Sequence, residues 1–417
     1  MSGHGPGRGG STVRDVRGDV GGAGLARGAR AQTERAVCDS FQSHGGPSRW
    51  GESLDPHPSN ARLMITMEEL LALLVRQGGS DLHISVGSPP RIRVNGTLLP
   101  VEHPPLDAET TRRLATSVLN SDQIARLDRD LELDCSFGIE GYGRFRVNTF
   151  HQRGSVASVL RSIPAGTPTF EELGMPLETC QKLCNMASGL VLFTGVTGSG
   201  KSTSLAAMID YINTNRADHI VTIEDPVEFT HVHKNCLVTQ REIGDDTRNF
   251  KAALKSVLRQ DPDIVLVGEL RDHETIEAAL TLAETGHLTF GTLHTSDAVQ
   301  TINRIIDVFA ADQQEQVRTM LSFTLEAVFC QKLIPTSRGD GRALAAEIMI
   351  ATPGIRALIR DDKAHQIYSH IQTGGKLGMQ TMSQSLADLV QAGACRLRDA
   401  ERVLSDTKEL HSALKAA

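Results

Sequence analysis

Nine residues near the middle of the chain constrain its fold more than any others. The stretch from Gly195 to Thr203 fits the phosphate-binding pattern G-x-x-x-x-G-K-[ST] at every fixed position. Its glycines let the backbone curl so that N–H groups face one centre, where Lys201 reaches the β and γ phosphates and Ser202 holds magnesium. An apolar run at 190–194 precedes the loop and a helix-like stretch follows it. The sequence therefore predicts a nucleotide-binding loop made of Gly195, Val196, Thr197, Gly198, Ser199, Gly200, Lys201, Ser202 and Thr203.

The composition narrows the class of protein. A chain of 417 residues has room for two or three domains. Its formal net charge of −7 argues against a protein that coats nucleic acid, because such binding needs clustered lysine and arginine. The seven cysteines lack the C-x-x-C spacing of a zinc knuckle, and we expect them to be reduced thiols. No run approaches the ~18 to 20 apolar residues that cross a bilayer, and no signal-peptide core is visible. We expect a cytoplasmic protein without a nucleic-acid partner.

The first 63 residues are rich in glycine and arginine and have no apolar periodicity, so we expect them to be disordered. A nucleic-acid arm is an alternative that the interspersed acidic residues argue against, and translation starting at Met64 or Met67 is another. A capping box at Thr66 and Glu69 then predicts a helix. Strands follow, with a hairpin signal at Asn95-Gly96 and further strands near 131–137, 143–150 and 155–161. Residues 64–163 are thus expected to form a small α+β domain.

The two prolines in the stretch 163–168 predict a domain boundary and a hinge. Beyond it, short apolar strands alternate with helical patterns, which predicts parallel βαβ units in a doubly wound sheet. The expected strands cover 190–194, 219–223, 264–267 and 288–291, and the expected helices cover 203–213, 248–259, 273–283 and 297–308. From Thr352 onward the signals are helical, interrupted mainly at Gly374-Gly375. We therefore expect an α/β core over 164–351 and a helical C-terminal region over 352–417.

Two of these strands are predicted to end in carboxylates, which bear on whether a bound nucleotide is hydrolysed. One strand ends at Glu224 and Asp225, and the other ends at Glu269. The usual Walker B strand closes with Asp followed by Glu, but here Gly268 has the Asp position. The metal-side carboxylate must then come from elsewhere, and either Glu224 or Asp225 could supply it. Because open α/β sheets bind ligands at the carboxyl ends of strands, we expect both ends to form the site rather than to be solvated carboxylates or helix caps.

Four histidines lie near these strands. His287 and His294 bracket one strand and are seven residues apart, so they point to opposite faces and a shared metal is not expected. A neutral histidine at this strand end could sense the γ phosphate or could be a satisfied structural histidine, and the residues alone leave both open. His231 and His233 are predicted to lie in a surface loop rather than to bind a metal.

Four segments together resemble the motifs of the type II/IV secretion ATPase superfamily. They are 195–203 for the Walker A motif, 222–229 for the Asp box, 261–272 for the atypical Walker B motif and 287–295 for the His box. The chain is also similar to the PilT-type pilus retraction ATPases of this superfamily at 80–84, 240–244, 365–374 and 379–382. The resemblance runs from about Met64 to about Leu389.

The resemblance implies a RecA-like P-loop ATPase domain preceded by a PAS-like domain, in a homo-hexamer that binds ATP and Mg²⁺ between subunits. Hydrolysis would rotate one domain against the other and retract a type IV pilus, acting on an inner-membrane platform protein from the cytoplasmic side and alongside a paralogous retraction ATPase. The catalytic glutamate corresponds to Glu269. Glu224 corresponds to the Asp-box glutamate, which we expect near magnesium, directly or through water, and His294 belongs to the His box. Two arginines that approach the triphosphate correspond to Arg146 and Arg161.

One motif departs from the family pattern. The C-terminal retraction motif at 354–361 has Ala357 where family members have Asn, although a helix with a basic face is still expected. Two alternatives stay open. An assembly or secretion ATPase is one, against which the missing tetracysteine zinc insert counts. The other is a slow-hydrolysing nucleotide-binding paralogue of the motor, against which the intact Lys201 and Glu269 count. The charge balance disfavours a DNA translocase.

Overall fold

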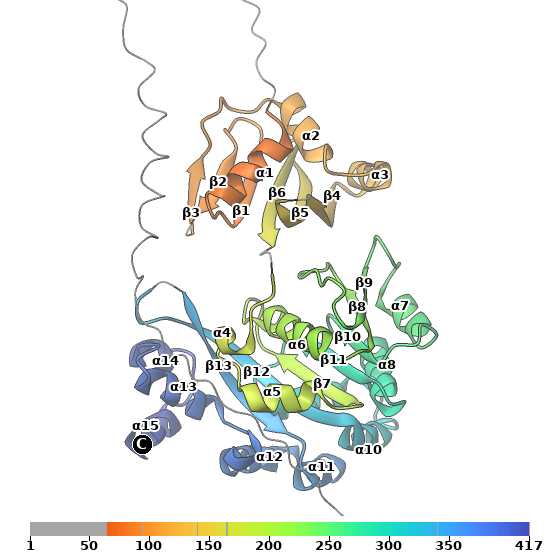
Figure 1. The fold of residues 1–417 in the computed structure, drawn as a ribbon, viewed down its shortest axis with the longest axis vertical. Coiled ribbons are helices and arrows are strands. Elements are labelled where there is room, and N and C mark those ends of the chain that lie inside the picture. The colour runs from red at the N-terminus through yellow and green to blue at the C-terminus, as the bar shows by residue number, and fades with distance from the viewer. Residues whose placement is uncertain (1–64, 95, 140, 164–165, 340, 417) are drawn as a thin grey trace, which may run out of the picture. The chain divides into compact units, whose positions relative to one another are not determined.

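The described strands form two separate sheets, one from each side of residue 165 in the sequence (Figure 1). The computed structural model describes residues 65–416 except 95, 140, 164, 165 and 340. The predictions for residues 1–63, for Asn95 in the hairpin and for the hinge at 164–165 fall outside these residues. Within the described ranges, no helix combines the length and the apolar character needed to span a bilayer.

The first sheet is antiparallel, and its described strands follow the order β3-β2-β1-β6-β5-β4. Three helices contribute side chains to its core. The strands are β1 (Asp81–Ile84), β2 (Arg91–Val94), β3 (Thr97–Pro100), β4 (Glu132–Ile139), β5 (Gly143–Gln152) and β6 (Ser155–Ile163), and the helices are α1 (Met67–Arg76), α2 (Ala108–Thr116) and α3 (Ser121–Asp130). The capping box at Thr66 is confirmed, since its hydroxyl and the Glu69 carboxylate each accept the other residue's backbone N–H. The likeness of this unit to a PAS domain stays a prediction.

The second sheet contains the phosphate loop, and its described strands follow the order β13-β12-β7-β11-β10-β8-β9. All neighbouring pairs are parallel except β12 with β13. The strands are β7 (Gly189–Thr194), β8 (His219–Glu224), β9 (Leu237–Glu242), β10 (Ile264–Val267), β11 (Leu288–Leu293), β12 (Leu325–Pro335) and β13 (Arg342–Ile350). Every residue of β7, β10 and β11 is buried, as expected where helices cover both faces of a parallel sheet.

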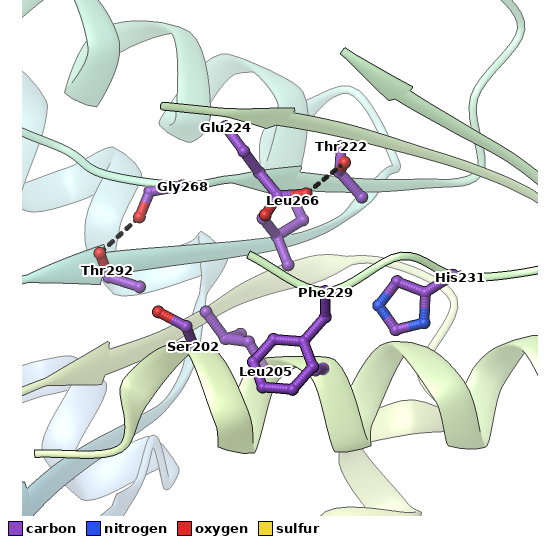
Figure 2. A pocket seen from close by; sticks show the side chains of 10 residues that line it. Ser202, Leu205, Thr222, Glu224, Phe229, His231, Leu266, Gly268 and Thr292 are labelled. Atoms are coloured by element: carbon purple, nitrogen blue, oxygen red, sulfur yellow. Dashed lines mark hydrogen bonds between the residues drawn. The ribbon is translucent and has the colours of Figure 1, made fainter. Parts of the chain in front are cut away.

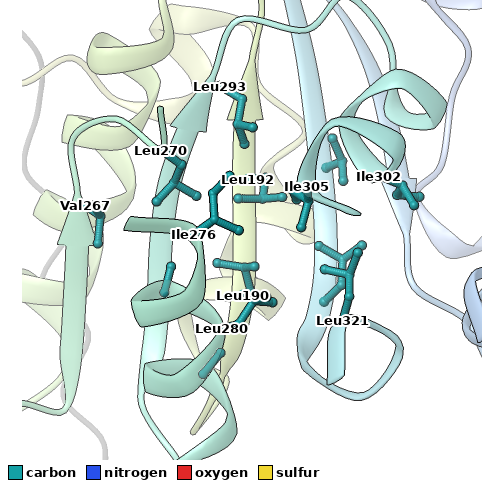
Figure 3. Packing of buried hydrophobic residues seen from close by; sticks show 14 of the residues in the cluster. Leu190, Leu192, Val267, Leu270, Ile276, Leu280, Leu293, Ile302, Ile305 and Leu321 are labelled. Atoms are coloured by element: carbon teal, nitrogen blue, oxygen red, sulfur yellow. The ribbon is translucent and has the colours of Figure 1, made fainter. Parts of the chain in front are cut away.

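Alternate residues of the parallel strands serve two cores. Leu190 and Leu192 of β7 pack into one core, whereas Val191 and Phe193 pack into the other. Figure 3 shows part of the first core, where Leu190 and Leu192 lie among side chains from the helices. The helices on this side include α7 (Phe250–Val257), α8 (His273–Glu284), α9 (Ala298–Asp307) and α10 (Gln314–Thr324), and those on the other side are α4 (Phe170–Leu173), α5 (Leu177–Cys184) and α6 (Lys201–Asn215).

The doubly wound parallel sheet predicted from the sequence is confirmed. Each of the four predicted strands and four predicted helices has a counterpart whose ends lie within two residues of the predicted ones. Several elements were not predicted, namely α2, α3, α4, α5, α10, β9 and the long β12–β13 hairpin. The hairpin extends the sheet beyond β7 and brings a further set of side chains to the edge of the phosphate loop, where Leu333 lies 3.6 Å from the position a Cβ on Gly200 would take.

The helical character of the C-terminal region is also confirmed. Its helices are α11 (Pro353–Arg360), α12 (Ile367–Thr373), α13 (Met382–Gln391), α14 (Leu397–Glu401) and α15 (Lys408–Ala416), with two 3₁₀ turns, η1 (Ala364–Gln366) and η2 (Gly375–Leu377). On α11, which carries the altered motif, the Arg356 guanidinium donates to the carbonyls of Ser322 and Phe323 and to the carboxylate of Glu326. Arg360 lies 5.8 Å from the centre of the Phe323 ring. Both arginines of the expected basic face therefore contact other parts of the chain, Arg356 through hydrogen bonds and Arg360 through an aromatic ring.

Candidate active site

The phosphate loop has the backbone shape that its glycines allow. Gly195, Gly198 and Gly200 have φ angles of 137°, 80° and 94°, in the region that side chains disfavour. A Cβ on Gly195 would lie 2.5 Å from the Gln331 carbonyl oxygen, so this position also lacks space. The loop leads into α6, whose N-cap has no side-chain hydrogen bond. The first N–H groups of α6 are therefore available to an anion.

Lys201 lies at the centre of this loop. Its Nζ donates to the carbonyl oxygens of Gly195 at 2.8 Å and Val196 at 3.2 Å. The residue is buried, and burial lowers the pKa of its amine while the charges of Glu269 and Glu228 oppose that shift. An ammonium group held in this way can be released to a phosphate oxygen, which would form a stronger charge-assisted hydrogen bond than a carbonyl does.

A cavity of about 510 Å³ adjoins the loop, a size suited to a small-molecule ligand. Most of the predicted site residues line it, whereas Gly195, Val196 and Ser199 do not. Those that do are Arg146, Arg161, Thr197, Gly198, Gly200, Lys201, Ser202, Thr203, Glu224, Glu269 and His294. Two further arginines, Arg271 and Arg342, complete a set of five cationic side chains. Such a set suits a polyphosphate, because guanidinium groups bind phosphate oxygens in pairs.

Glu269 follows β10 and is bound by two side chains. Its Oε1 lies 2.6 Å from Arg271 Nε and 3.1 Å from His294 Nε2. The pKa of Glu269 is lowered, because the hydrogen bonds and charges of Arg271 and His294 outweigh the opposing effect of partial burial. The structure thus brings the ionised carboxylate of Glu269, which follows β10, next to the imidazole of His294, which follows β11.

Glu224 ends β8 and is held by neutral groups. Its Oε1 accepts hydrogen bonds from Thr222 Oγ1 at 2.7 Å and from Gln240 Nε2 at 3.3 Å, and its Oε2 accepts from the Glu228 N–H at 3.4 Å. Burial raises the pKa of Glu224 despite these bonds. Figure 2 shows Glu224 above a small cavity of about 40 Å³, with Ser202 on the opposite wall.

The glycine in place of the Walker B aspartate has a physical cause. A Cβ on Gly268 would lie 3.1 Å from the Ile223 carbonyl oxygen and 3.7 Å from Glu224 Cγ. The backbone of Ile223 and Glu224 therefore crowds the position next to Gly268, while Asp225 is exposed. Ser202 and Glu224 line the same small cavity from opposite sides. Mg²⁺ prefers oxygen ligands such as a hydroxyl and a carboxylate. These residues fit a magnesium ion.

The remaining histidines have separate surroundings. His287 Nδ1 lies 3.0 Å from the Leu282 carbonyl oxygen, at the opposite end of β11 from His294, which suits a structural histidine. His233 Nδ1 accepts the Val238 N–H at 3.1 Å. His231 lines the small cavity beside Glu224, and its buried Nδ1 has no hydrogen-bond partner within the described ranges.

Three residues of the site were not found from the sequence, namely Gln240, Arg271 and Arg342. Arg271 lies two positions after Glu269, a spacing that places it near the same strand end. Nothing in the sequence pattern indicates that Gln240 reaches Glu224 from β9, or that Arg342 at the start of β13 lines the cavity.

Comparisons with known proteins show the family of the chain. Residues 58–402 match the family described as Type II/IV secretion system protein. The chain is 53% identical over 325 residues to the type IV pilus retraction ATPase PilT of Pseudomonas aeruginosa, covering 78% of this chain and 94% of that protein. It is 49% identical over 321 residues to a twitching motility protein of Neisseria gonorrhoeae, covering 77% and 86%.

The fold matches a solved structure of the same kind. The crystal structure of the pilus retraction motor PilT with bound ADP aligns with a TM-score of 0.78 and 47% sequence identity, covering 84% of this chain and 99% of that chain. The α/β class expected from the sequence is confirmed by this match.

Proposed function

Because the chain belongs to the type II/IV secretion system protein family, we propose that it is an ATP-hydrolysing motor that drives retraction of type IV pili. The observation that carries the proposal is the carboxylate of Glu269, which lines the same cavity as Lys201 and the phosphate loop. An unprotonated carboxylate at this position can orient a water molecule next to a phosphate and accept its proton, which a nucleotide-binding loop alone cannot do.

Each cavity residue has a part in this reaction. The loop N–H groups and Lys201 bind the β and γ phosphates, and Glu269 orients the attacking water and takes its proton. His294 donates to Glu269 and fixes its orientation. Ser202 and Glu224 are the residues that would hold Mg²⁺, which neutralises charge on the phosphates when bound. Arg146 and Arg161 oppose the charge that develops on the transferred phosphoryl group.

The mechanical part of the proposal concerns the assembly. Residues 64–163 act as an N-terminal domain, 164–351 as the ATPase core and 352–417 as a helical C-terminal region. Six copies form a ring in which ATP binding and hydrolysis rotate one domain against the other. The ring acts on a platform protein from the cytoplasmic face of the inner membrane, and a paralogous retraction ATPase joins it. The relatives named for pilus retraction and twitching support this direction of work over assembly.

A slow-hydrolysing accessory paralogue is the second candidate, and one contact favours it. Arg271 occupies the Glu269 oxygen at 2.6 Å, where it competes with a water molecule for the carboxylate. Rapid turnover by the purified protein would exclude this candidate.

The test of the proposal is steady-state phosphate release by the purified full chain with Mg-ATP. We expect Lys201→Ala to lower kcat by at least about 100-fold, the size seen when one donor to a developing charge is removed. The matched control is Lys182→Ala, an exposed lysine on α5, which should leave turnover unchanged. In a strain that lacks the protein, the wild type should restore pilus retraction and Glu269→Gln should not. Turnover insensitive to Lys201→Ala, or retraction restored by Glu269→Gln, would refute the motor.

A further inference from the structure

A buried carboxylate in the first sheet holds one of the two cavity arginines. Asp81 begins β1, is only 5% exposed, and pairs directly with Arg161 across the antiparallel β1–β6 ladder. Residues directly opposite one another on such a pair present their side chains on the same face. Asp81 Oδ1 accepts a hydrogen bond from Arg161 Nε at 2.8 Å. The position of the guanidinium is therefore tied to a group that the fold itself fixes.

The carboxylate of Asp81 is fixed on its other side as well. Its Oδ2 accepts a hydrogen bond from Ser80 Oγ at 2.7 Å and lies 3.6 Å from Arg93 Nε. Burial works against ionisation of Asp81, but the Ser80 and Arg161 hydrogen bonds and the Arg161 charge lower its pKa overall. With both oxygens engaged, the carboxylate cannot rotate, so it restrains Arg161 to one orientation.

Without Asp81, the charge of Arg146 would push Arg161 away from this position. Arg146 on β5 pairs directly with Arg161 on β6, and like charges in that position repel. The three residues form a row across neighbouring strands, with Arg161 in the middle. Asp81 offsets the repulsion from one side, which keeps both arginines on the face that lines the cavity.

The contact uses only the inner edge of the guanidinium. The Arg161 side chain remains 69% exposed although its Nε is bound to Asp81. Its two terminal nitrogens have no acceptor in the part of the chain that the structure describes, and the residue lines the cavity that contains Lys201. A guanidinium held by Nε presents these two nitrogens as a fixed fork, the geometry that phosphate oxygens accept in pairs.

We propose that Asp81 is a positioning residue for hydrolysis, which holds Arg161 so that its terminal nitrogens meet the triphosphate. The inference rests on the proposed function, in which Arg161 stabilises charge on the phosphates. Asp81 itself is not among the residues that line the cavity. It acts by removing the conformational freedom that Arg161 would otherwise lose when the phosphates bind.

The test is a double-mutant cycle on the full chain with Asp81→Asn and Arg161→Ala. We expect Arg161→Ala to lower kcat by at least about 100-fold. Asp81→Asn should lower kcat by about 10- to 100-fold, because misplacement of a catalytic group has effects of this size, while KM for ATP changes less than about threefold. In the Arg161→Ala background, Asp81→Asn should have no further effect on kcat.

Two controls separate positioning from folding. Asp128→Ala breaks the exposed ion pair with Arg112, 2.7 Å in length, in the same unit and should leave kcat unchanged. Melting temperatures and the affinity for a fluorescent ATP analogue should be similar for wild type and Asp81→Asn. Additive losses of kcat in the double variant would overturn the inference while leaving the Lys201 result, and with it the proposed ATPase, intact. Full activity of Arg161→Ala would show that the arginine has no role in hydrolysis, and it would therefore overturn the inference about Asp81 as well.

Discussion

The two strand ends that supply carboxylates to the cavity differ in what surrounds them. At the end of β8, the half-buried Glu224 accepts hydrogen bonds from a hydroxyl, an amide and a backbone N–H, and desolvation raises its pKa. Just beyond β10, Glu269 is bound by a guanidinium and an imidazole, and its pKa is lowered. Neighbouring strands of one sheet thus give two glutamates opposite tendencies to hold a proton. Groups whose pKa values are pushed apart in this way take different parts in a reaction.

The parallel register explains why the two glutamates do not compete for one position. Val267 pairs with Ile223, so Gly268 follows in register beside Glu224, and Glu269 comes one residue later. The missing side chain at Gly268 leaves room for the backbone of Ile223 and Glu224. Three predictions test whether the two glutamates differ in this way.

The largest effect is expected for Glu269→Gln. An amide of the same shape cannot accept the proton of the attacking water, so kcat should fall by about 10²- to 10⁴-fold. Affinity for a fluorescent ATP analogue should stay within about threefold, because the loop and Lys201 are unchanged. The matched control is Glu284→Gln at the exposed end of α8, which should behave as wild type. A Glu269→Gln variant with more than a tenth of wild-type turnover would show that another group acts as the base.

A smaller and different effect is expected for Glu224→Gln. The amide oxygen can still accept from Thr222 and Gln240, and only the 3.4 Å hydrogen bond from the Glu228 N–H is lost, so the melting temperature should change little. The Mg²⁺ concentration for half-maximal turnover should rise about 10- to 100-fold, the usual cost of altering a metal's ligand shell. Titration of ATPase activity with Mg²⁺ measures this, and direct titration of protein and ADP with Mg²⁺ checks it without turnover. An unchanged Mg²⁺ concentration for half-maximal turnover would show that Glu224 does not contribute to Mg²⁺ binding.

The smallest effect is expected for Arg271→Ala. Arg271 lowers the pKa of Glu269, so its removal raises that pKa and the carboxylate becomes protonated at a higher pH. The acidic limb of the kcat/KM profile should therefore move to higher pH. Above that limb, kcat should change by no more than about fivefold, since the arginine is mostly exposed. A profile that does not move, or that moves to lower pH, would contradict the assignment of Glu269 as the titrating group. A marked increase in kcat would show that Arg271 slows hydrolysis in the wild-type protein.

The sequence alone located most of this site because its parts are local. The phosphate loop, Glu224 and Glu269 each follow a short buried strand, and the carboxyl ends of parallel strands must meet at one edge of a sheet. The sequence alone shows that Gly268 stands at the Asp position of the Walker B motif, and it therefore also indicates that another residue must supply this carboxylate. The residues alone left Glu224 and Asp225 open, and only the family resemblance favoured Glu224, an assignment that stays a prediction.

The parts that were missed depend on pairing between distant segments. Gln240 reaches Glu224 only because β9 lies beside β8, which no local pattern encodes. The β12–β13 hairpin forms part of a sheet whose neighbouring strand, β7, lies about 130 residues earlier in the chain, so its apolar residues had no visible partner. The Asp-Gly dipeptide at 340–341 is the one local signal that indicates this hairpin.

The hydrogen bonds of Lys201 to Gly195 and Val196 carry a consequence for calorimetry. Nucleotide binding at this loop is an exchange, in which two internal hydrogen bonds are given up as the ammonium turns to the phosphate. The measured binding enthalpy then reports the difference between two sets of contacts rather than the strength of the new set. Lys201→Met makes neither the internal hydrogen bonds nor the phosphate contacts. Its loss of nucleotide affinity should therefore be smaller than the strength of the phosphate contacts alone.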